Sequence, residues 1–241
     1  MTRLAYWINP EHLITDTMER LKRSFLNDPA RSVWLDNFLK PEHCDRLERV
    51  FSCEGMFEDA HQLYDEDGPN RTRPVGLAEW QAAGEAARFH HELKFLGPRP
   101  EYRMGIGFLT SLRYDKFLES DEYLDFLERL TGIRLGGVSA SMLRITRFGH
   151  RLDRHSDAKP GRSLCSILYL SGGWDPAFGG RFRQYQGDKV LRALEPRRNR
   201  LVIFEPTADN IHDVERLTPC ATDWERRAMT TWFAPKTSEE R

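Results

Sequence analysis

Two histidines and one aspartate in this sequence have the residue types and the spacing of a metal site. His155 and Asp157 flank Ser156. At a strand end, residues i and i+2 point the same way, so an imidazole and a carboxylate can reach one ion. His212 lies 55 residues beyond Asp157, a length that several strands of a barrel would occupy. Two histidines and a carboxylate that leave three positions open are the arrangement non-haem iron(II) uses for oxygen chemistry. The sequence therefore predicts an iron site.

The segment Arg226–Phe233 strengthens the prediction of an iron site, because neither His155-x-Asp157 nor His212 is specific alone. A histidine beside an acidic residue is common by chance, and an isolated loop histidine is more often simply hydrogen bonded. In a strand, every second residue of this segment shares one face, namely Arg226, Ala228, Thr230 and Trp232. An arginine there can pair with a carboxylate of a small dianionic cosubstrate, and the threonine can donate to it. The register is open at this stage, so Arg227 is the alternative.

The second half of the chain has the pattern of strands joined by short turns. After Gly136-Gly137, alternating or continuous apolar segments are bounded by glycine, proline and asparagine turns. The expected strands are Ser139–Thr146, Ser163–Leu170, Arg181–Tyr185, Lys189–Leu194, Arg200–Phe204 and Arg226–Phe233. Six or more strands in this order are typical of a sandwich or barrel.

The first half has mostly helical spacing of its apolar residues. Helices are expected over residues 10–27, from Pro41 onward, over 77–95 and over 121–130, with one lead-in strand at Ser32–Leu35. Residues 54–75 are polar and rich in Asp, Gly, Pro and Arg, so we interpret them as a loop, either a substrate lid or a plain connector. We therefore expect an α+β protein. Its mostly helical residues 1–135 would be integral to a barrel formed by 136–241.

Composition excludes several classes of function. The 241 residues are 39% hydrophobic and 30% charged, as in ordinary globular proteins. The 36 basic and 37 acidic residues leave a formal charge of −1, without the basic excess of a nucleic-acid binder. No apolar stretch approaches the roughly 18 residues of a membrane helix. We expect neither nucleic acid nor membrane as a partner.

Cysteine usage and the N-terminal segment bear on the compartment. The four cysteines are scattered and form no CxxC pair, which argues against a disulfide framework or a cysteine zinc site. Met1–Trp7 has no apolar core or cleavage site of a signal peptide. We expect a cytoplasmic protein.

The run from Leu143 to Phe233 resembles the catalytic barrel of iron(II)- and 2-oxoglutarate-dependent dioxygenases, in the prolyl-hydroxylase-like branch. The matching pieces are Gly149-x-x-Leu152-x-x-His155-x-Asp157, Ile167-Leu168-Tyr169-Leu170, Trp174 with Gly179-Gly180, Pro196-x-x-Asn199-Arg200-Leu201-Val202-Ile203-Phe204, His212-x-Val214 and Arg226-x-Ala228-x-Thr230-x-Trp232. The resemblance implies a double-stranded β-helix, the jelly-roll or cupin-like barrel, as the catalytic core.

The resemblance also implies roles for single residues. His155, Asp157 and His212 would hold Fe(II), and Arg226 would bind the distal carboxylate of 2-oxoglutarate. Tyr169 and Thr230 would be supporting donors. Related halogenases lack the carboxylate of this triad, so a retained aspartate favours hydroxylation, with desaturation and ring closure as open alternatives.

The sequence departs from the family pattern in two places. Where relatives often carry a tyrosine before the HxD motif, this chain offers Thr146 or Phe148. The 14 residues from His212 to Arg226 exceed the usual spacing, so residues 215–225 are expected to form an extended loop near the site.

The implied activity is hydroxylation of an unactivated C–H bond, coupled to decarboxylation of 2-oxoglutarate to succinate and CO2 with O2 as oxidant. We expect a small amino-acid-like or natural-product substrate and a monomer or homodimer, because no extra recognition domain or repeat is visible. Three alternatives stay open. They are a prolyl-type protein hydroxylase, a non-catalytic barrel that binds metal and 2-oxoglutarate, and a zinc hydrolase using the same His/Asp/His ligands.

Two further groups of residues invite a functional interpretation. His90 and His91 are adjacent on the helix expected at 77–95, so they cannot share a face, and packing is the favoured role. Arginines of the expected strands and turns could point into the barrel and bind a substrate carboxylate, although a solvated face is the simpler interpretation. They are Arg144, Arg147, Arg162, Arg181 and Arg183.

Overall fold

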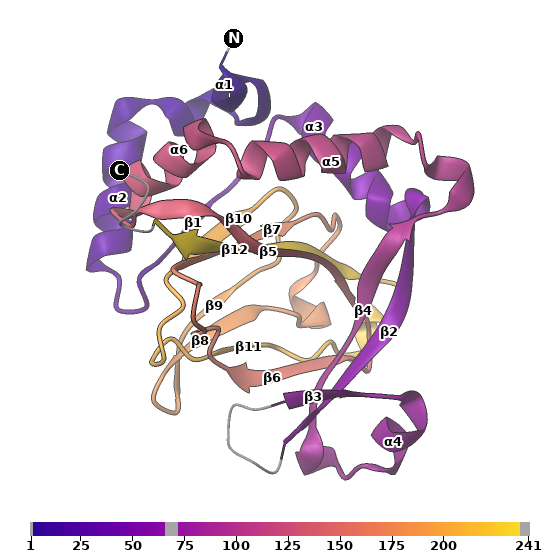
Figure 1. Ribbon diagram of the computed structural model, residues 1–241. Helices are drawn as coiled ribbons and strands as arrows, with labels where there is room; N and C mark the ends of the chain where they lie inside the picture. Colours follow the sequence, from indigo (N-terminus) through magenta and orange to yellow (C-terminus); the bar gives the residue numbers. More distant parts are fainter. Residues whose placement is uncertain (1, 66–71, 237–241) are drawn as a thin grey trace.

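The fold is a curled antiparallel β-sheet with helices packed on one side (Figure 1). The computed structural model describes residues 2–65 and 72–236. The strands of the first half are β1 (Ser32–Leu35), β2 (Gly55–Tyr64), β3 (Thr72–Val75) and β4 (Arg88–Pro98). Those of the second half are β5 (Leu135–Thr146), β6 (Arg151–His155), β7 (Leu164–Tyr169), β8 (Phe182–Gln186), β9 (Lys189–Leu194), β10 (Leu201–Phe204), β11 (His212–Val214) and β12 (Arg226–Pro235).

The strand order explains how the sheet closes around an interior. Neighbouring strands run β1-β10-β7-β12-β5-β4-β6-β11-β8-β9, and β2 pairs with both β3 and β4. The strands β6, β11, β8 and β9 fold back beneath β10, β7, β12 and β5 (Figure 1). This confirms the expected double-stranded β-helix, and the four strands of the first half belong to the same sheet.

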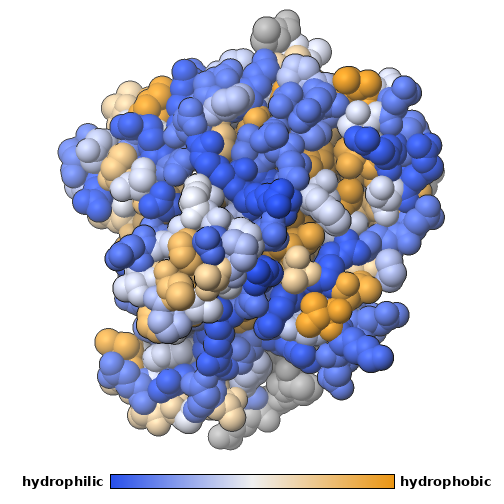
Figure 2. All heavy atoms as spheres, turned by 180° about the vertical axis from the view of Figure 1, so that it is seen from behind, coloured by the Kyte–Doolittle hydropathy of each residue, from blue (hydrophilic) through white to orange (hydrophobic). Residues whose placement is uncertain are grey.

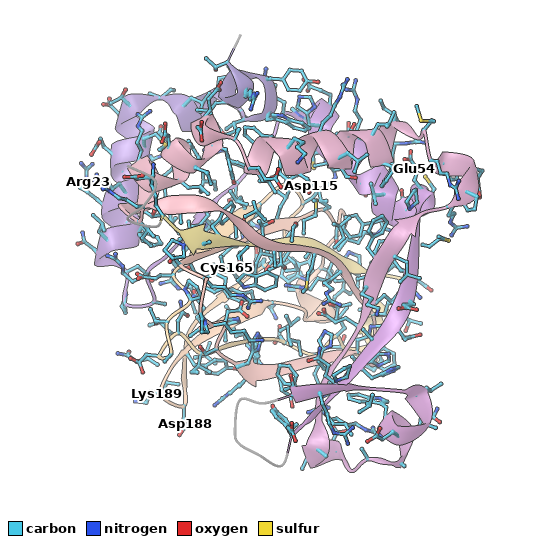
Figure 3. All side chains as sticks on the ribbon, viewed as in Figure 1. Arg23, Glu54, Asp115, Cys165, Asp188 and Lys189 are labelled. Carbon is cyan, nitrogen blue, oxygen red and sulfur yellow. The ribbon has the colours of Figure 1, made fainter. Side chains whose placement is uncertain are left out.

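Strand β7 lies between two apolar regions. All six of its residues are buried. Leu164 and Leu168 belong to the core beneath the helices, whereas Cys165, Ile167 and Tyr169 belong to a second core inside the barrel. Cys165 lies among the interior side chains in Figure 3. Because a strand alternates its faces, continuous hydrophobicity is what burial on both sides requires.

Most of the helices cover the outer face of the sheet (Figure 1). They are α1 (Arg3–Trp7), α2 (Thr15–Asn27), α3 (Pro41–Arg49), α5 (Ile106–Leu118) and α6 (Asp121–Thr131). The short helix α4 (Leu77–Ala82) lies apart from them, beside β3. Short helical turns are η1 (Pro10–Leu13), η2 (Val50–Glu54), η3 (Glu85–Ala87), η4 (Pro100–Tyr102), η5 (Pro176–Phe178) and η6 (Pro219–Ala221). Pro41 occupies the first turn of α3, where its missing N–H costs no hydrogen bond. Gly132, at φ 76°, ends α6 in the left-handed conformation.

Three expectations for the first half are wrong. The predicted loop 54–75 contains β2 and β3, although residues 66–71 lie outside the described part. The predicted helix 77–95 is the short helix α4 followed by β4. The predicted helix 10–27 is interrupted at Ile14, between η1 and α2. Pairing of β2 with β4 from Gly55 to Leu63 satisfies both backbones over a long distance in sequence, which outweighs local helical spacing.

A buried carboxylate fixes the start of α5. The cap residue Gly105 offers no side chain, and Glu54 accepts hydrogen bonds from the backbone N–H of Gly107 (3.2 Å) and Phe108 (2.8 Å). Burial alone would raise the pKa of Glu54, but these bonds and the Arg49 guanidinium lower it. Glu54 lies where η2 meets the beginning of β2 (Figure 3). Remote capping of this kind ties α5 to the first strand of the β2–β4 pair.

The surface seen in Figure 2 is mostly hydrophilic, with hydrophobic residues in separate small groups. Among residues 2–65 and 72–236, no helix has the length and apolar character needed to cross a bilayer.

Candidate metal centre

The three predicted ligands converge inside the barrel. His155 ends β6 and His212 begins β11, and the two are register partners on paired strands. Asp157 follows two residues after β6. Its Oδ1 lies 3.8 Å from Nε2 of His155, and its Oδ2 lies 3.6 Å from Nε2 of His212. One donor atom from each of the three residues lies within 4.8 Å of the others.

Both histidines are oriented by the same local device. Nδ1 of His155 lies 2.8 Å from the carbonyl oxygen of Asp153, and Nδ1 of His212 lies 3.0 Å from that of Asn210. A carbonyl can only accept, so Nδ1 carries the proton in each ring. The Nε2 lone pairs are therefore left free and directed at Asp157, as metal-binding imidazoles require.

Two aromatic rings pack against His212. Phe182 and Phe204 pack their rings about His212, with centroids 5.1 and 5.0 Å away. Burial is the main cause that lowers the pKa of His155 to about 4, and the nearby His212 contributes less. The His155 imidazole is therefore neutral at neutral pH. Burial would raise the pKa of Asp157, but the nearby His212, followed by His155 and the indole N–H of Trp232, lowers it overall. The site thus combines a neutral His155 imidazole with an ionised Asp157 carboxylate.

A cavity of about 200 Å³ contains the triad. One face of β12 lines it, and the residues of that face are Arg226, Ala228, Thr230 and Trp232. Arg227 points away, and its guanidinium pairs with Glu225 (3.1 Å) and Glu48 (3.5 Å). The strand register therefore turns Arg226 inward.

Arg226 is buried with part of its donor capacity unused. Its Nη2 donates to the hydroxyl of Tyr169 at 3.2 Å, while its Nε has no partner among the described residues. Burial raises the pKa of Tyr169, so the phenol is neutral. A buried guanidinium with an unpaired N–H is costly, and a carboxylate of a ligand would satisfy it.

A buried acidic residue of the cavity wall was not predicted as a site residue. Glu92 of β4 accepts from Thr146 Oγ1 (3.0 Å) and from His90 Nε2 (3.0 Å). Burial would raise the pKa of Glu92, but the His90 hydrogen bond and the charges of His90, Arg226 and Arg144 lower it to about 2. The pattern His90-x-Glu92 reveals this pair only when the segment is interpreted as a strand.

Thr146 stands opposite Arg226 in the pairing of β5 with β12. Thr146 is one of the two residues considered for the family's tyrosine, and its hydroxyl donates to Glu92. Phe148, the other residue considered for it, is 47% exposed and does not line the cavity.

The cavity walls come from both halves of the chain. Gln62 and Tyr64 of β2 and Thr72 of β3 line it, so the described part of 54–75 forms a wall of the site. Four cations line it as well, namely Arg144, Arg154, Lys159 and Arg162. The other three arginines that were expected as candidates for an inward position lie outside the cavity. Arg147 pairs with Glu225, Arg181 with Glu215, and Arg183 with Asp213.

The segment 215–225 joins β11 to β12 through η6. Thr218 donates to the carbonyl of Ala177, and the indole of Trp224 lies 5.6 Å from the ring of Phe178. These contacts place the segment against η5, and none of its residues lines the cavity.

Part of the barrel matches a known protein family. Residues 140–234 match the model of the 2OG-Fe(II) oxygenase superfamily. Over 119 residues it is 28% identical to mouse prolyl 3-hydroxylase OGFOD1, a match that covers 47% of this chain and 22% of that relative. The chain therefore spans only about a fifth of the length of this curated relative.

Solved structures share the fold of this barrel and its helices. A prolyl hydroxylase from Trichoplax adhaerens, in complex with a hypoxia-inducible-factor peptide fragment, superposes with a TM-score of 0.62 at 20% identity. The match covers 91% of each chain. The non-haem alpha-ketoglutarate-dependent epimerase SnoN of nogalamycin biosynthesis has a TM-score of 0.57 at 12% identity, covering 93% of this chain and 83% of that one.

The donor set suits the cofactors of this superfamily, which are Fe(II), 2-oxoglutarate and O2. Two free Nε2 lone pairs and one ionised carboxylate are ligands that iron(II) accepts with three positions left open. The unpaired Nε of Arg226 in the same cavity suits a dicarboxylate.

Proposed function

We propose that this protein is an oxygenase that hydroxylates an unactivated C–H bond with Fe(II), 2-oxoglutarate and O2. His155, Asp157 and His212 are the Fe(II) ligands. The observation that carries the proposal is their convergence, with both Nε2 atoms free, inside the cavity of a barrel that in part matches the 2OG-Fe(II) oxygenase superfamily.

The cosubstrate site consists of Arg226, Tyr169 and Thr230. Arg226 pairs with the distal carboxylate of 2-oxoglutarate through its free Nε, and Tyr169 holds the guanidinium through Nη2. Thr230 lies on the same face of β12, within the cavity. The hydroxyl of Thr230 is a second donor for that carboxylate.

When bound, the iron supplies O2 activation coupled to loss of CO2 from 2-oxoglutarate, and the protein supplies position and environment. The carbonyls of Asp153 and Asn210 keep both imidazoles in the ligating tautomer. Phe182 and Phe204 exclude water from one side of His212. The neutral Tyr169 adds no charge to the cosubstrate pocket, so Arg226 provides the positive charge there.

The substrate in this proposal is a small amino-acid-like or natural-product molecule with an anionic group. The supporting observation is the set of cavity cations outside the triad, Arg144, Arg154, Lys159 and Arg162. Nη1 of Arg144 is buried without a partner among the described residues, which suits a carboxylate. Within this proposal, residues 1–135 provide the β2–β3 wall and residues 136–241 the catalytic core.

A prolyl side chain of a protein is the second candidate substrate. The similarity to mouse prolyl 3-hydroxylase OGFOD1 favours it. Succinate release measured with free amino acids and with proline-containing peptides separates the two candidates.

The test of the activity is an anaerobic titration of the metal-free protein with Fe(II) and 2-oxoglutarate. We expect the weak visible charge-transfer band of a chelated keto acid, lost in Asp157→Ala. A folded protein that gives no band would contradict the proposal and favour a zinc hydrolase. A band without succinate for any substrate would favour a non-catalytic binding barrel.

A further inference from the structure

We propose a second metal site, separate from the iron centre, on the outer face of strands β2 and β4. Its ligands are Asp59, His61 and His91. Its ion is a divalent transition metal of the Zn²⁺ type. The site goes beyond the oxygenase reaction and does not depend on it.

The strands bring the first three ligands together. Asp59 and His61 are two residues apart on β2 and share a face, and His91 of β4 is the register partner of His61. One donor atom of each lies within 4.8 Å of the others. Tetrahedral Zn²⁺ with bonds near 2 Å separates its ligands by about 3.4 Å, so side-chain rotation alone closes the site.

Unused ring nitrogens point to a missing partner. Nε2 of His61 and Nδ1 of His150 are buried and have no hydrogen-bond partner among the described residues. Both residues are more than nine-tenths buried. The ring of His91 lies between them, with centroids 4.2 Å from His61 and 4.0 Å from His150. A bound ion would satisfy Nε2 of His61, which is otherwise buried at a cost.

The environment suits a transition metal. Two imidazoles and one carboxylate are ligands that Zn²⁺ accepts, whereas Ca²⁺ and Mg²⁺ require mostly oxygen. The indole of Trp80 covers His61 at 5.2 Å, and the Asp59 side chain is 57% exposed, which leaves a path for the ion.

This site and the iron cavity share strands but not faces. His90 and Glu92 of β4 and Gln62 and Tyr64 of β2 line the cavity. The alternate residues His91 and His61 turn the other way. An ion held here would join β2 and β4, which run side by side in Figure 1. It would thereby fix the wall that carries Tyr64.

The test uses the full chain with Asp157→Ala, which disables the iron site, so the result does not depend on the oxygenase activity. Equilibrium dialysis against Zn²⁺ alone should give one ion per chain. His91→Ala in that background should remove it, and Glu58→Gln, a neighbouring carboxylate on the opposite face paired with Lys94, should retain it.

Asp59→Asn provides the second variant, because its exposed side chain can change without loss of packing. It should weaken Zn²⁺ binding at least tenfold. Co²⁺ as a probe should give the intense visible bands of tetrahedral coordination in Asp157→Ala and lose them in both variants. Absence of Zn²⁺ from the folded Asp157→Ala protein, or its retention by His91→Ala, would overturn the proposal.

Discussion

The indole Nε1 of Trp232 donates to Oδ2 of Asp157 across 2.9 Å. Trp232 comes from β12 and Asp157 from the segment after β6, so this bond joins the face that carries Arg226 to the proposed metal ligand. The Arg162 guanidinium stacks on the same indole at 4.2 Å and lies 3.6 Å from Oδ1 of Asp157. The carboxylate is therefore oriented from two sides before any ion binds.

Replacing Trp232 should weaken metal binding more than it weakens the fold. Trp232→Phe keeps an aromatic ring and removes the hydrogen bond, so the Fe(II) dissociation constant should rise about 10- to 100-fold, as for other partners of metal ligands. Trp224→Phe, whose indole donates to the carbonyl of Gly172 outside the cavity, is the matched control. Equal Fe(II) affinity in both variants would mean that Trp232 does not orient Asp157.

The inward direction of Arg226 predicts a difference between adjacent arginines. Arg226→Ala should raise the KM for 2-oxoglutarate about 10- to 100-fold, because a charge-assisted hydrogen bond contributes about 1.5–3 kcal/mol. Arg227→Ala should leave that KM within about twofold, since its guanidinium pairs with Glu225 and Glu48. Steady-state kinetics at varied 2-oxoglutarate measure both, and the opposite ranking would refute the assignment.

Replacing the carboxyl group of Asp115 on α5 should raise the free energy of unfolding in a pH-dependent way (Figure 3). Burial and the nearby Glu119 raise the pKa of Asp115 from its ordinary 3.8 to about 6, and its Oδ1 has no partner among the described residues. The folded state therefore binds this proton more tightly than the unfolded state. The stabilisation that this provides is present in acid and is lost as the pH rises from about 4 through 6.

Asp115→Asn removes the loss of stability that ionisation of Asp115 causes. Its free energy of unfolding should exceed that of the wild type by on the order of 2 kcal/mol at pH 7, with the difference vanishing below pH 4. Urea unfolding at several pH values measures it. Asp125→Asn, at an exposed position of α6, should show no such gain. A difference that stays constant across the pH range would mean that ionisation of Asp115 is not its cause.

Asn199, which does not line the cavity, stabilises the fold through its side chain. Its amide accepts from the N–H of Leu39 at 2.9 Å and donates to the carbonyl of Leu39 at 2.7 Å. Asn199→Ala leaves both buried backbone groups of Leu39 without a partner and places alanine at φ 61°. The free energy of unfolding should therefore fall by about 2–4 kcal/mol.

Comparison with Asn199→Gly separates the two causes. Glycine adopts the left-handed conformation without strain but loses the same hydrogen bonds. The free energy of unfolding of Asn199→Gly, measured by thermal unfolding, should therefore be about 1 kcal/mol larger than that of Asn199→Ala. Equal stabilities of the two variants would show that the backbone conformation is not strained there.

The second half of the fold was predictable because its strands are buried on one or both faces. Continuous apolar runs such as Leu164–Tyr169 and the glycine turns between strands record that burial directly. The motif around His155 and the alternation after Arg226 likewise reflect backbone geometry that does not depend on distant contacts.

The first half was less predictable because long-range pairing determines it. Strand β2 has polar residues on its exposed positions, so its sequence resembles a loop until β4 pairs with it. Helix α5 was not predicted because apolar residues lie all around it, and its buried Thr110 and Ser111 donate to carbonyls of their own helix. The Glu92–His90 pair was missed because the segment that forms β4 has helical spacing and was interpreted as a helix.

The pairing of His155 with His212 makes β6 intolerant of changes in length. Register between β6 and β11 sets which side chains enter the cavity, and a shift by one residue reverses the faces of a strand. A single-residue deletion within Arg151–His155 should therefore abolish the ligand set even if the barrel still closes. Insertions within residues 215–225, which line no part of the cavity, should be accepted. The barrel thus separates positions where evolution can add residues from positions where it can only exchange them.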